Sequence, residues 1–404
     1  MPETLRNLHL SPNILSLTWF LSLNSLVFYT CFAIDEQGQA LLAWKNSLNG
    51  STDALRSWNS LDQSPCKWYG IHCNTNGEVE KISLKGVDLQ GSLPSDFQPL
   101  KSLKTLNLSS SNLTGTIPKE FGDYQELTLI DLSNNSLSGG IPQEICKLWK
   151  LQSLALNTNF LEGEILAEIG NLSNLVYLTL YDNQLSGEVP KSIGKLRKLE
   201  VFRAGGNKDL KGEVPWEIGN CTSLVKLGLA ATSISGSLPS SIGMLRRVRT
   251  IAIYTSLLSG AIPEEIGNCS ELQNLYLHQN PISSPIPRRI GELRKLKTLS
   301  LWQSNLVGTI PDELGSCTEL TLADFAENLL TGSIPRSFGN LSRLRHLSLS
   351  DNSLLTGSIP DELGSCTELT FVELSRNLLT GSIPRSFANL SKLQQLRLSG
   401  NQLS

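Results

Sequence analysis

Residues 175–198 read LVYLTLYDNQLSGEVPKSIGKLRK, and this stretch of 24 residues decides the fold because most of the chain repeats it. The repeated form is LxxLxLxxNxLxGxIPxxLGxLxx, and clear copies begin at Leu103, Leu127, Leu151, Leu224, Leu272, Leu296 and Leu320. We count about thirteen full units from Val79 and a partial one from Leu393. One unit cannot bury its own leucines, so its core must come from stacking on its neighbours.

This pattern is that of a leucine-rich repeat. Each unit contributes a short strand from its LxL core, and the Asn of the NxL step turns the chain and satisfies backbone groups of neighbouring turns. The Leu-Ser/Thr-Gly-x-Ile-Pro variant resembles the plant-specific class of these repeats. We therefore expect an α/β solenoid: a plant-type leucine-rich-repeat superhelix with a parallel β-sheet on its concave face and 3-10 or irregular segments on its convex side.

The composition excludes several classes of protein. The chain has 404 residues, of which 40% are hydrophobic and 18% charged, with a formal net charge of -3. This near-neutral balance argues against nucleic acid as the main partner, and the composition excludes a disordered, collagen-like or multi-pass membrane protein. The four histidines are scattered and no cysteine spacing fits a metal, so we expect neither a metal nor a cofactor.

The N-terminal segment has the features of a signal peptide. The stretch from Ile14 to Phe32 is mostly apolar and follows a short segment that carries Arg6. Small residues at Cys31 and Ala33 and the polar run that follows predict cleavage after Ala33, so residues 1–33 are expected to form the signal peptide. The alternative is a signal anchor. Because no second apolar stretch of spanning length follows, we expect a soluble product in the secretory pathway.

Residues 34–78 resemble the N-terminal cap of plant receptor ectodomains, and residues 79–404 carry the repeats. The cap covers the open apolar end of the first repeat, with three tryptophans as packing residues: Trp44, Trp58 and Trp68. Cys66 and Cys73 lie close together just before the repeats, and an oxidising compartment would join them in a disulfide. Four further cysteines recur at one repeat position and are predicted to be small buried residues: Cys221, Cys269, Cys317 and Cys366.

Asn-x-Ser/Thr sequons agree with a secreted glycoprotein. Eight are predicted glycosylation sites: Asn49, Asn112, Asn134, Asn171, Asn220, Asn268, Asn340 and Asn389. A ninth, Asn107, is expected to point into the working surface.

Three irregularities interrupt the repeat. Leu166 replaces the usual Pro and Ser284 the usual Gly, and both are interpreted as local tolerance. Residues 308–355 are duplicated as residues 357–404, with one extra residue near Leu354. The chain stops inside a repeat without a C-terminal cap, membrane helix or kinase domain, so we expect it to be incomplete.

Side chains that flank the inward leucines face the concave side, because strand side chains alternate between two faces. In the unit that begins at Leu199, Arg203 is followed by Gly205 and Gly206, which are expected to leave backbone N–H groups accessible. The next strand adds only small residues there: Gly228, Ala230 and Ala231. We expect a small cavity with a guanidinium at its edge, suited to a compact anion. The alternative is a loosely packed strand with a solvated arginine.

The neighbouring concave positions carry aromatic and amide side chains with little charge. The candidate ligand-binding residues there are Tyr254, Tyr276, His278, Trp302, Gln303 and Asp324. The same pattern places further residues on this lining: Tyr177, Thr179, Tyr181, Asp182, Val201, Lys226, Thr250, Ala252, Thr255, Asn274, Gln279, Thr298, Ser300, Ala326 and Glu327. Eight units accommodate roughly ten residues of an extended peptide, because strands stack at about 4.8 Å and a peptide advances about 3.3 Å per residue. A linear peptide with an anionic head suits this surface better than a compact metabolite.

Four segments resemble the ectodomains of plant receptor kinases of the root meristem growth factor receptor family: residues 202–207, 227–233, 251–256 and 299–303. In that family an Arg-x-Gly-Gly motif receives a sulfated tyrosine near the N-terminus of the peptide, and Arg203, Gly205 and Gly206 match this motif. The resemblance implies a plasma-membrane receptor with a co-receptor kinase of the somatic embryogenesis type. This chain has no kinase motifs, so it is not expected to be an enzyme.

Two other interpretations compete with this one. A secreted inhibitor resembling polygalacturonase-inhibiting proteins, or a defence receptor that binds a protein partner, would share the repeat and the cap. The inhibitors have about ten repeats and a C-terminal cap, which disfavours them. An enzyme would need an acid–base pair, but Asp324 and Glu327 are expected to lie on one solvated strand end without a supporting His or pocket.

Overall fold

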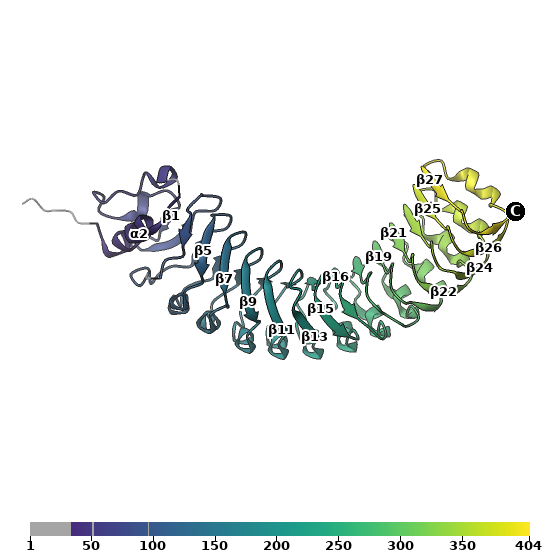
Figure 1. The fold of residues 1–404 in the computed structure, drawn as a ribbon, viewed down its shortest axis with the longest axis horizontal. Coiled ribbons are helices and arrows are strands. Elements are labelled where there is room, and N and C mark those ends of the chain that lie inside the picture. Colours follow the sequence, from purple (N-terminus) through teal and green to yellow (C-terminus); the bar gives the residue numbers. More distant parts are fainter. Residues whose placement is uncertain (1–33, 51, 96) are drawn as a thin grey trace, which may run out of the picture.

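The computed structural model describes residues 34–404 apart from Ser51 and Asp96. The predicted signal peptide, residues 1–33, lies outside the described residues. The chain forms a crescent with the cap at one end and the C-terminal residues at the other (Figure 1). The predicted solenoid with a concave parallel sheet and 3-10 segments is therefore confirmed.

The concave face is a sheet of 15 strands, in which only β1 runs antiparallel to its neighbour β2. The LxL core of each unit forms one strand, whose leucines point inward. The strands are β1 (Ile71–Cys73), β2 (Val79–Ser83), β4 (Thr105–Asn107), β6 (Leu129–Asp131), β8 (Ser153–Ala155), β10 (Tyr177–Thr179), β12 (Val201–Arg203), β14 (Lys226–Gly228), β16 (Thr250–Ala252), β18 (Asn274–Tyr276), β19 (Thr298–Ser300), β21 (Leu322–Asp324), β23 (His346–Ser348), β25 (Phe371–Glu373) and β27 (Gln395–Arg397).

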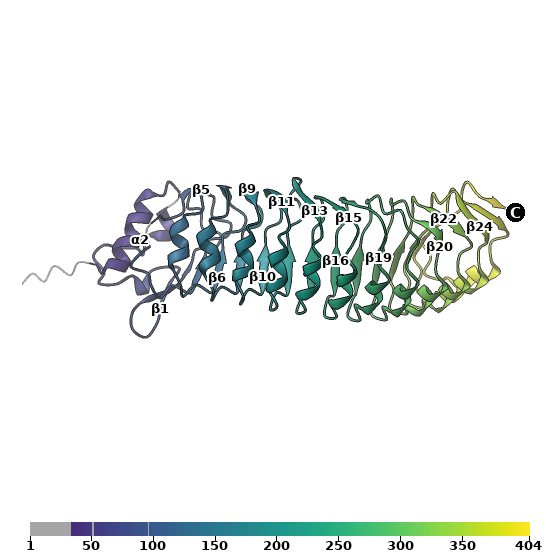
Figure 2. The same ribbon diagram turned by 90° about the horizontal axis from the view of Figure 1, so that it is seen from below.

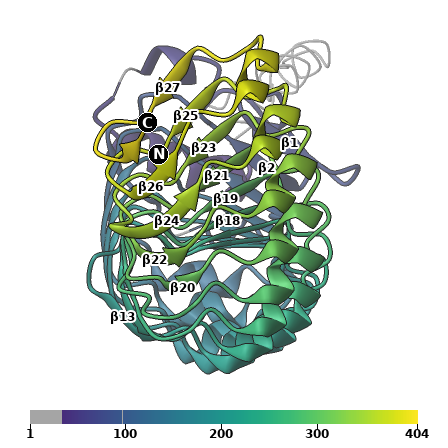
Figure 3. The ribbon, with the colours of Figure 1, turned by 90° about the vertical axis from the view of Figure 1, so that its right-hand side faces the viewer.

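A second layer of short parallel strands, which the sequence analysis did not predict, runs along one flank of the solenoid. Eight strands form its first part: β3 (Gly91–Ser92), β5 (Leu113–Thr116), β7 (Ser136–Gly139), β9 (Phe160–Glu164), β11 (Gln184–Glu188), β13 (Leu210–Glu213), β15 (Ser233–Gly236) and β17 (Leu257–Leu258). Five form its second part: β20 (Val307–Thr309), β22 (Leu329–Gly332), β24 (Leu354–Ser358), β26 (Leu378–Gly381) and β28 (Gln402–Leu403). Figure 3 looks along the solenoid and shows this flank and the 3-10 segments on different sides of the concave strands.

The flanking sheet breaks between β17 and β20, in the unit that carries Ser284. Here Ser284 and Pro285 replace the Gly-x step, and Pro285 has no N–H to donate to a neighbouring strand. The interpretation of Ser284 as local tolerance was therefore wrong, because the substitution coincides with a gap in the sheet.

The convex side carries a row of five-residue 3-10 segments, seen from below in Figure 2. They are η3 (Lys119–Asp123), η4 (Gln143–Lys147), η5 (Ala167–Asn171), η6 (Lys191–Lys195), η7 (Trp216–Asn220), η8 (Ser240–Met244), η9 (Glu264–Asn268), η10 (Arg288–Glu292), η11 (Asp312–Ser316), η12 (Arg336–Asn340), η13 (Asp361–Ser365) and η14 (Arg385–Asn389). A proline precedes most of them, and its fixed φ suits the entry to a helical turn. Leu166 precedes η5 with φ -61° and ψ 143°, close to Pro190 before η6 at -68° and 140°, so the backbone tolerates leucine there.

The core is one continuous column of buried side chains inside the solenoid. The four predicted cysteines are fully buried, and burial raises the pKa of the Cys221 thiol to about 12, which makes it inert. Cys146 in η4, which the sequence analysis did not assign, is also buried.

A ladder of buried asparagines ties successive units together, as the NxL step predicts. Asn159, for example, donates from Nδ2 to the carbonyls of Leu132 and Leu156, both at 3.0 Å, while its Oδ1 accepts from the N–H of Leu137 at 3.0 Å. Each such side chain therefore satisfies groups on its own unit and on the unit before it.

The cap closes the N-terminal end of the column. Its helix α2 (Glu36–Ser47) begins at Asp35, whose carboxylate accepts from the N–H of Gly38 at 2.7 Å, and two short 3-10 segments follow, η1 (Thr52–Leu55) and η2 (Pro65–Lys67). The three predicted tryptophans are buried, and Trp58 stacks on Trp68 with ring centroids 5.4 Å apart. Cys66 and Cys73 are joined in a disulfide.

Candidate ligand-binding surface

The parallel register brings one residue from each concave strand into a row across the sheet. Thr179 pairs with Arg203, Arg203 with Gly228, Gly228 with Ala252, and Ala252 with Tyr276. Residues 24 or 25 positions apart in the sequence therefore become neighbours about 4.8 Å apart. The run of small residues between Arg203 and Tyr276 hollows the surface at its centre.

The hollow has a volume of about 630 Å³. Nine of the predicted ligand-binding residues line it: Arg203, Gly205, Gly206, Gly228, Ala230, Ala231, Tyr254, Tyr276 and His278. Five other lining residues were placed on this surface by the sequence pattern but were not chosen as ligand-binding residues: Tyr181, Asp182, Lys226, Thr250 and Ala252. The alternation of side chains along each strand predicts that these five residues face the concave side. It does not distinguish a residue that contacts a ligand from its neighbours on the same face. The hollow extends over five units and is larger than the small cavity that we expected.

Arg203 forms one wall of the hollow. Its guanidinium carbon lies 4.0 Å from the centre of the Tyr181 ring, a cation–π contact that holds the side chain flat. A Cβ on Gly228 would lie 3.3 Å from Cγ of Arg203, so the glycine leaves room for the arginine stem. The guanidinium keeps its N–H groups for a ligand, because Arg203 makes no ion pair among the described residues.

The two glycines are needed for backbone geometry. Gly206 has φ +75°, and a Cβ there would lie 2.2 Å from Oδ1 of Asp182; a Cβ on Gly205 would lie 2.6 Å from the carbonyl oxygen of Ala230. The N–H of Gly206 donates to the Ala230 carbonyl at 2.8 Å. The expectation that both glycines leave N–H groups accessible is therefore wrong for Gly206, because the next unit takes its hydrogen bond.

An aromatic strip continues the hollow toward the C-terminus. His278 stacks between Tyr254, at 4.5 Å between ring centroids, and Trp302, at 5.2 Å, and Tyr276 meets it edge-on at 6.4 Å. Burial lowers the pKa of His278 below 6.5, so the ring is neutral at pH 7, and its Nδ1 lies 3.0 Å from Oγ of Ser300. The strip offers a rigid amphipathic surface for an extended chain.

The remaining predicted residues lie beyond the hollow. Gln303 accepts a 2.8 Å bond from Gln279, which in turn accepts from Thr255 at 2.7 Å, so the amides form a row beside the strip. Asp324 is half-buried, its Oδ1 accepts from the N–H of Ala326 at 3.2 Å, and burial raises the pKa of its carboxyl group. The expectation of a solvated strand end is therefore wrong for Asp324.

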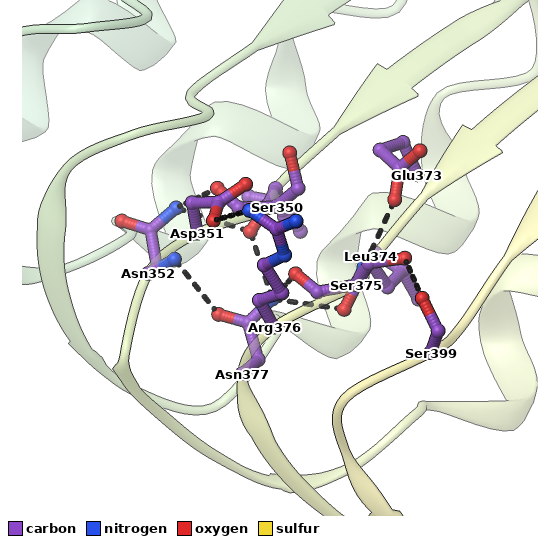
Figure 4. Close-up of polar contacts among 10 residues, drawn as sticks. Ser350, Asp351, Asn352, Glu373, Leu374, Ser375, Arg376, Asn377 and Ser399 are labelled. Atoms are coloured by element: carbon purple, nitrogen blue, oxygen red, sulfur yellow. Dashed lines mark hydrogen bonds and ion pairs between the residues drawn. The ribbon is translucent and has the colours of Figure 1, made fainter.

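The concave lining changes character near the C-terminal end, where charges pair with one another. Arg376 pairs with Asp351 at 3.2 Å, and Arg397 pairs with Glu373 at 3.2 Å. Figure 4 shows the Arg376–Asp351 pair beside the asparagine ladder that joins Asn352 to Asn377. These charges neutralise each other, whereas Arg203 makes no ion pair among the residues that the structure describes.

A larger hollow of about 740 Å³ lies where the flanking sheet breaks, beside Pro285. Three of its four charged residues are satisfied locally, because Glu264 accepts from the N–H groups of Arg288 and Arg289, and Arg288 reaches Glu313 at 3.5 Å. The hollow around Arg203 is therefore the better candidate for an anionic ligand. Within residues 34–404, apart from the two omitted positions, no cluster could hold a metal ion and no helix could cross a membrane.

The predicted glycosylation sites lie on three parts of the surface. Asn171, Asn220, Asn268, Asn340 and Asn389 end 3-10 segments on the convex side, Asn112 and Asn134 follow concave strands, and Asn49 follows α2. Two of these amides are engaged, since Asn112 donates to Asp88 at 2.8 Å and Asn268 accepts from Arg289 at 2.7 Å. Asn107 is half-buried on the concave face, where its Oδ1 accepts from Ser109.

Family models of leucine-rich repeats match the chain along most of its length. The leucine rich repeat N-terminal domain matches residues 34–74, the leucine-rich repeat region matches residues 143–256, and the leucine rich repeat matches residues 101–161, 294–354 and 357–403. The matched residues are therefore the N-terminal domain and repeats of a leucine-rich-repeat protein.

Three known proteins give the likeness more detail. The LRR receptor-like serine/threonine-protein kinase RGI3 of Arabidopsis thaliana is 62% identical over 99 residues, 24% of this chain and 9% of that protein. The solved plant peptide hormone receptor RGFR1 in complex with RGF2 is 62% identical with a TM-score of 0.81, over 84% of this chain and 53% of that chain. The Arabidopsis receptor kinase HAESA, solved with the peptide hormone IDA and the co-receptor SERK1, is 28% identical with a TM-score of 0.53, over 92% and 82%.

This chain spans about half the length of the solved RGFR1 chain. Over that half, fold and sequence agree with the resemblance to this receptor family. The chain is thus a leucine-rich-repeat protein that matches the ectodomain of the root meristem growth factor (RGF) receptor family.

Proposed function

We propose that this chain is the extracellular ligand-binding part of a plant receptor-like kinase and recognises a short, tyrosine-sulfated secreted peptide through its concave surface. The single observation that carries the proposal is the guanidinium of Arg203, which makes no ion pair in the described part of the chain and lies at the wall of a hollow floored by glycine and alanine. The similar RGFR1 ectodomain was solved with a peptide, RGF2.

The geometry around Arg203 suits a sulfate. Guanidinium N–H groups donate in a fixed fork that matches a tetrahedral anion, and the contact with Tyr181 holds this fork before a ligand arrives. Lys226 on the neighbouring strand adds a second positive charge to the same hollow. The aromatic ring of a sulfated tyrosine would lie over the small side chains of Ala230 and Ala252, where no bulky group blocks it.

The rest of the peptide would follow the aromatic strip. Its chain would run in an extended form across β16, β18 and β19, past the stacked rings of Tyr254, His278 and Trp302. Rigid aromatic rings lose little entropy on binding, and the nearby amides offer hydrogen bonds to a peptide backbone.

The direct experiment is calorimetric binding of synthetic RGF2, with and without sulfate on its tyrosine, to the full chain. Sulfate should strengthen binding at least about tenfold, and Arg203→Ala should remove that gain, since a charge-assisted hydrogen bond contributes about 1.5–3 kcal/mol. Arg246→Ala, an exposed arginine outside the hollow, is the matched control and should bind as the wild type does. Equal binding of both peptides by a folded sample would contradict the proposal and favour the secreted-inhibitor alternative.

The proposal extends to location and partners. As in the HAESA complex with SERK1, a co-receptor kinase of the somatic embryogenesis type would join the receptor once the peptide is bound. The chain would face the apoplast after passing the secretory pathway, with the full-length relative held in the plasma membrane. A kinase domain would have to lie outside these 404 residues for the receptor to signal.

A further inference from the structure

One edge of the solenoid carries exposed basic side chains that the proposed peptide site does not use. They lie in η6 or in the turns that lead from η6 to β12 and from η8 to β16, and together they form the basic edge: Lys191, Lys195, Arg197, Lys198, Arg246 and Arg247. None of them makes an ion pair among the residues that the structure describes. The basic edge therefore presents uncompensated positive charge to the solvent.

The repeat shows why these charges are uncompensated. Elsewhere a basic residue just before the first leucine of a unit pairs with a glutamate at the same position of the preceding unit: Lys150 with Glu126, Lys295 with Glu271, Arg343 with Glu319, and Lys392 with Glu368. Before Lys198 and Arg247 that position holds Asn174 and Ser223 instead. Lys198 donates to Oδ1 of Asn174 at 2.8 Å, which leaves its charge in place. The ladder of ion pairs is thus interrupted at the basic edge by the loss of its acids.

An open hollow of about 560 Å³ lies at the start of the basic edge. Its lining includes three cations, Lys191, Lys195 and Arg197, and one acid, Glu217. The two 3-10 segments that form it, η6 and η7, approach closely, since a Cβ on Gly194 would lie 2.5 Å from the carbonyl oxygen of Glu217. The hollow is therefore a preformed surface with a net positive charge.

An exposed indole lies beside these cations. Trp216 is the first residue of η7, as Lys191 is of η6, and it is 54% exposed. Its backbone is fixed, because its carbonyl accepts from Oγ of Ser241 in the next unit at 2.5 Å. An indole offers a flat apolar face with a polar edge, on which the C–H face of a sugar ring stacks.

The cations of the basic edge are spread along the solenoid and do not converge on one point. Lys198 and Arg247 occupy the same repeat position two units apart, a separation of roughly 10 Å at a strand spacing of about 4.8 Å. A linear polyanion spans such a row, whereas a compact anion does not. Anionic lipids are concentrated in the cytoplasmic leaflet, which disfavours a membrane as the partner of an extracellular chain. The indole favours a sugar chain over an acidic peptide.

We propose that the basic edge and Trp216 bind an acidic polysaccharide, a linear chain of uronic acid sugars. Its carboxylates meet the cations, while one of its sugar rings stacks on the indole of Trp216. This site is separate from the hollow around Arg203, so the inference goes beyond peptide recognition. It gives the chain a second ligand, an extracellular polymer that holds it in place.

The test is calorimetric binding of an unesterified oligogalacturonide to the full chain, beside the methyl-esterified form, which has the same sugars without the charge. The unesterified form should bind, more weakly as salt rises, and the ester should not. Lys195→Gln, Arg197→Gln and Arg247→Gln together should weaken binding at least about tenfold. The matched control is Lys295→Gln, Arg343→Gln and Lys392→Gln together, which removes the same net charge from paired positions and should bind as the wild type does.

Trp216→Ala separates a sugar site from a merely cationic surface. It should weaken oligogalacturonide binding at least about threefold and leave any binding of polyglutamate unchanged. Trp149→Ala is its control, since Trp149 is 53% exposed but lies outside the basic edge. A folded chain that binds neither form of the sugar, or both equally, would overturn the proposal. Binding that is insensitive to Trp216→Ala and equal for polyglutamate would also overturn it, in favour of an acidic peptide.

Asn220, a predicted glycosylation site, also lines the hollow. The wild-type chain is therefore secreted from eukaryotic cells for this experiment and compared with Asn220→Gln. The two should bind the oligogalacturonide within about twofold of each other. Binding by Asn220→Gln alone would show that a glycan covers the site, and would overturn the proposal for the secreted protein.

Discussion

Gly206 combines two constraints that can be separated by substitution. Its φ of +75° strains any other residue, and a Cβ would strike the Asp182 carboxylate. Gly163 has a similar φ of +79° with nothing within 4 Å of its Cβ position, so it carries only the first constraint.

We therefore expect Gly206→Ala to lower the free energy of unfolding by more than the roughly 1–2 kcal/mol expected of Gly163→Ala, and to abolish peptide binding as well. Urea unfolding and calorimetry measure the two effects. Equal losses of stability in the two variants would show that the carboxylate moves aside freely.

Asp324 predicts a pH dependence of stability. Burial raises the pKa of its carboxyl group above the ordinary 3.8, so the folded state binds this proton more tightly than the unfolded state does. The free energy of unfolding therefore falls as pH rises from about 3.8 through the pKa of the folded state, and the deficit persists at pH 7.

Asp324→Asn keeps an acceptor for the N–H of Ala326 without the charge. We expect this variant to be more stable than the wild type at pH 7, and the difference to disappear below pH 3.8. Glu327→Gln, an exposed carboxylate on the same unit, is the control and should change little. Thermal unfolding across pH would contradict the account if both variants behaved alike.

At the scale of one structural element, the asparagine ladder does more than turn the chain. Asn328 donates to the carbonyls of Leu301 and Phe325 at 2.9 and 3.0 Å and accepts from the N–H of Leu306 at 3.0 Å. Asn328→Ala leaves these buried groups without partners and should cost roughly 2–4 kcal/mol, since each unsatisfied group costs about 1–3 kcal/mol. Asn305→Ala, an exposed asparagine of the preceding unit, should cost under about 0.5 kcal/mol in the same urea titration.

Substitutions in a single unit interrupt the flanking sheet. The Gly of this step has positive φ in eleven of the described units, ten with Leu-x-Gly and one with Ile-x-Gly, which lets the chain pass into a flanking strand. Ser284 and Pro285 remove both the glycine and a donor, so the strand is lost in that unit. The repeat consensus made this substitution visible, but only the stacking of neighbours showed that it divides a sheet.

The extra residue of the duplicated region is accommodated within one loop of its unit. The extra residue falls between Asn352 and Leu355, and the similar extra residue of the Arg203 unit falls between Asn207 and Leu210. In both loops the leucine N–H donates to the asparagine carbonyl, at 2.8 and 3.1 Å, so the ladder and the core stay in register.

For the whole molecule, stability is set by stacking between neighbours, so the cost of a core substitution depends on where its unit lies. Leu299 is fully buried in β19, whereas Leu396 occupies the same repeat position in β27 and is 37% exposed. We expect Leu299→Ala to cost about 2–5 kcal/mol and Leu396→Ala under about 1 kcal/mol. Similar losses in urea unfolding would contradict this picture of a solenoid stabilised by its neighbours.

The sequence by itself determined the architecture, because a 24-residue period admits one way for each unit to bury its leucines. It also identified Arg203 and its two glycines, since a break in a strict pattern is visible without a structure. The tertiary structure alone decided which groups are used up and which are free. It assigned the N–H of Gly206 to Ala230, the guanidinium of Arg203 to the face of Tyr181, and the carboxylate of Asp182 to the same hollow. Such assignments join residues of different units, and that pairing depends on register and packing, which a one-dimensional pattern does not contain.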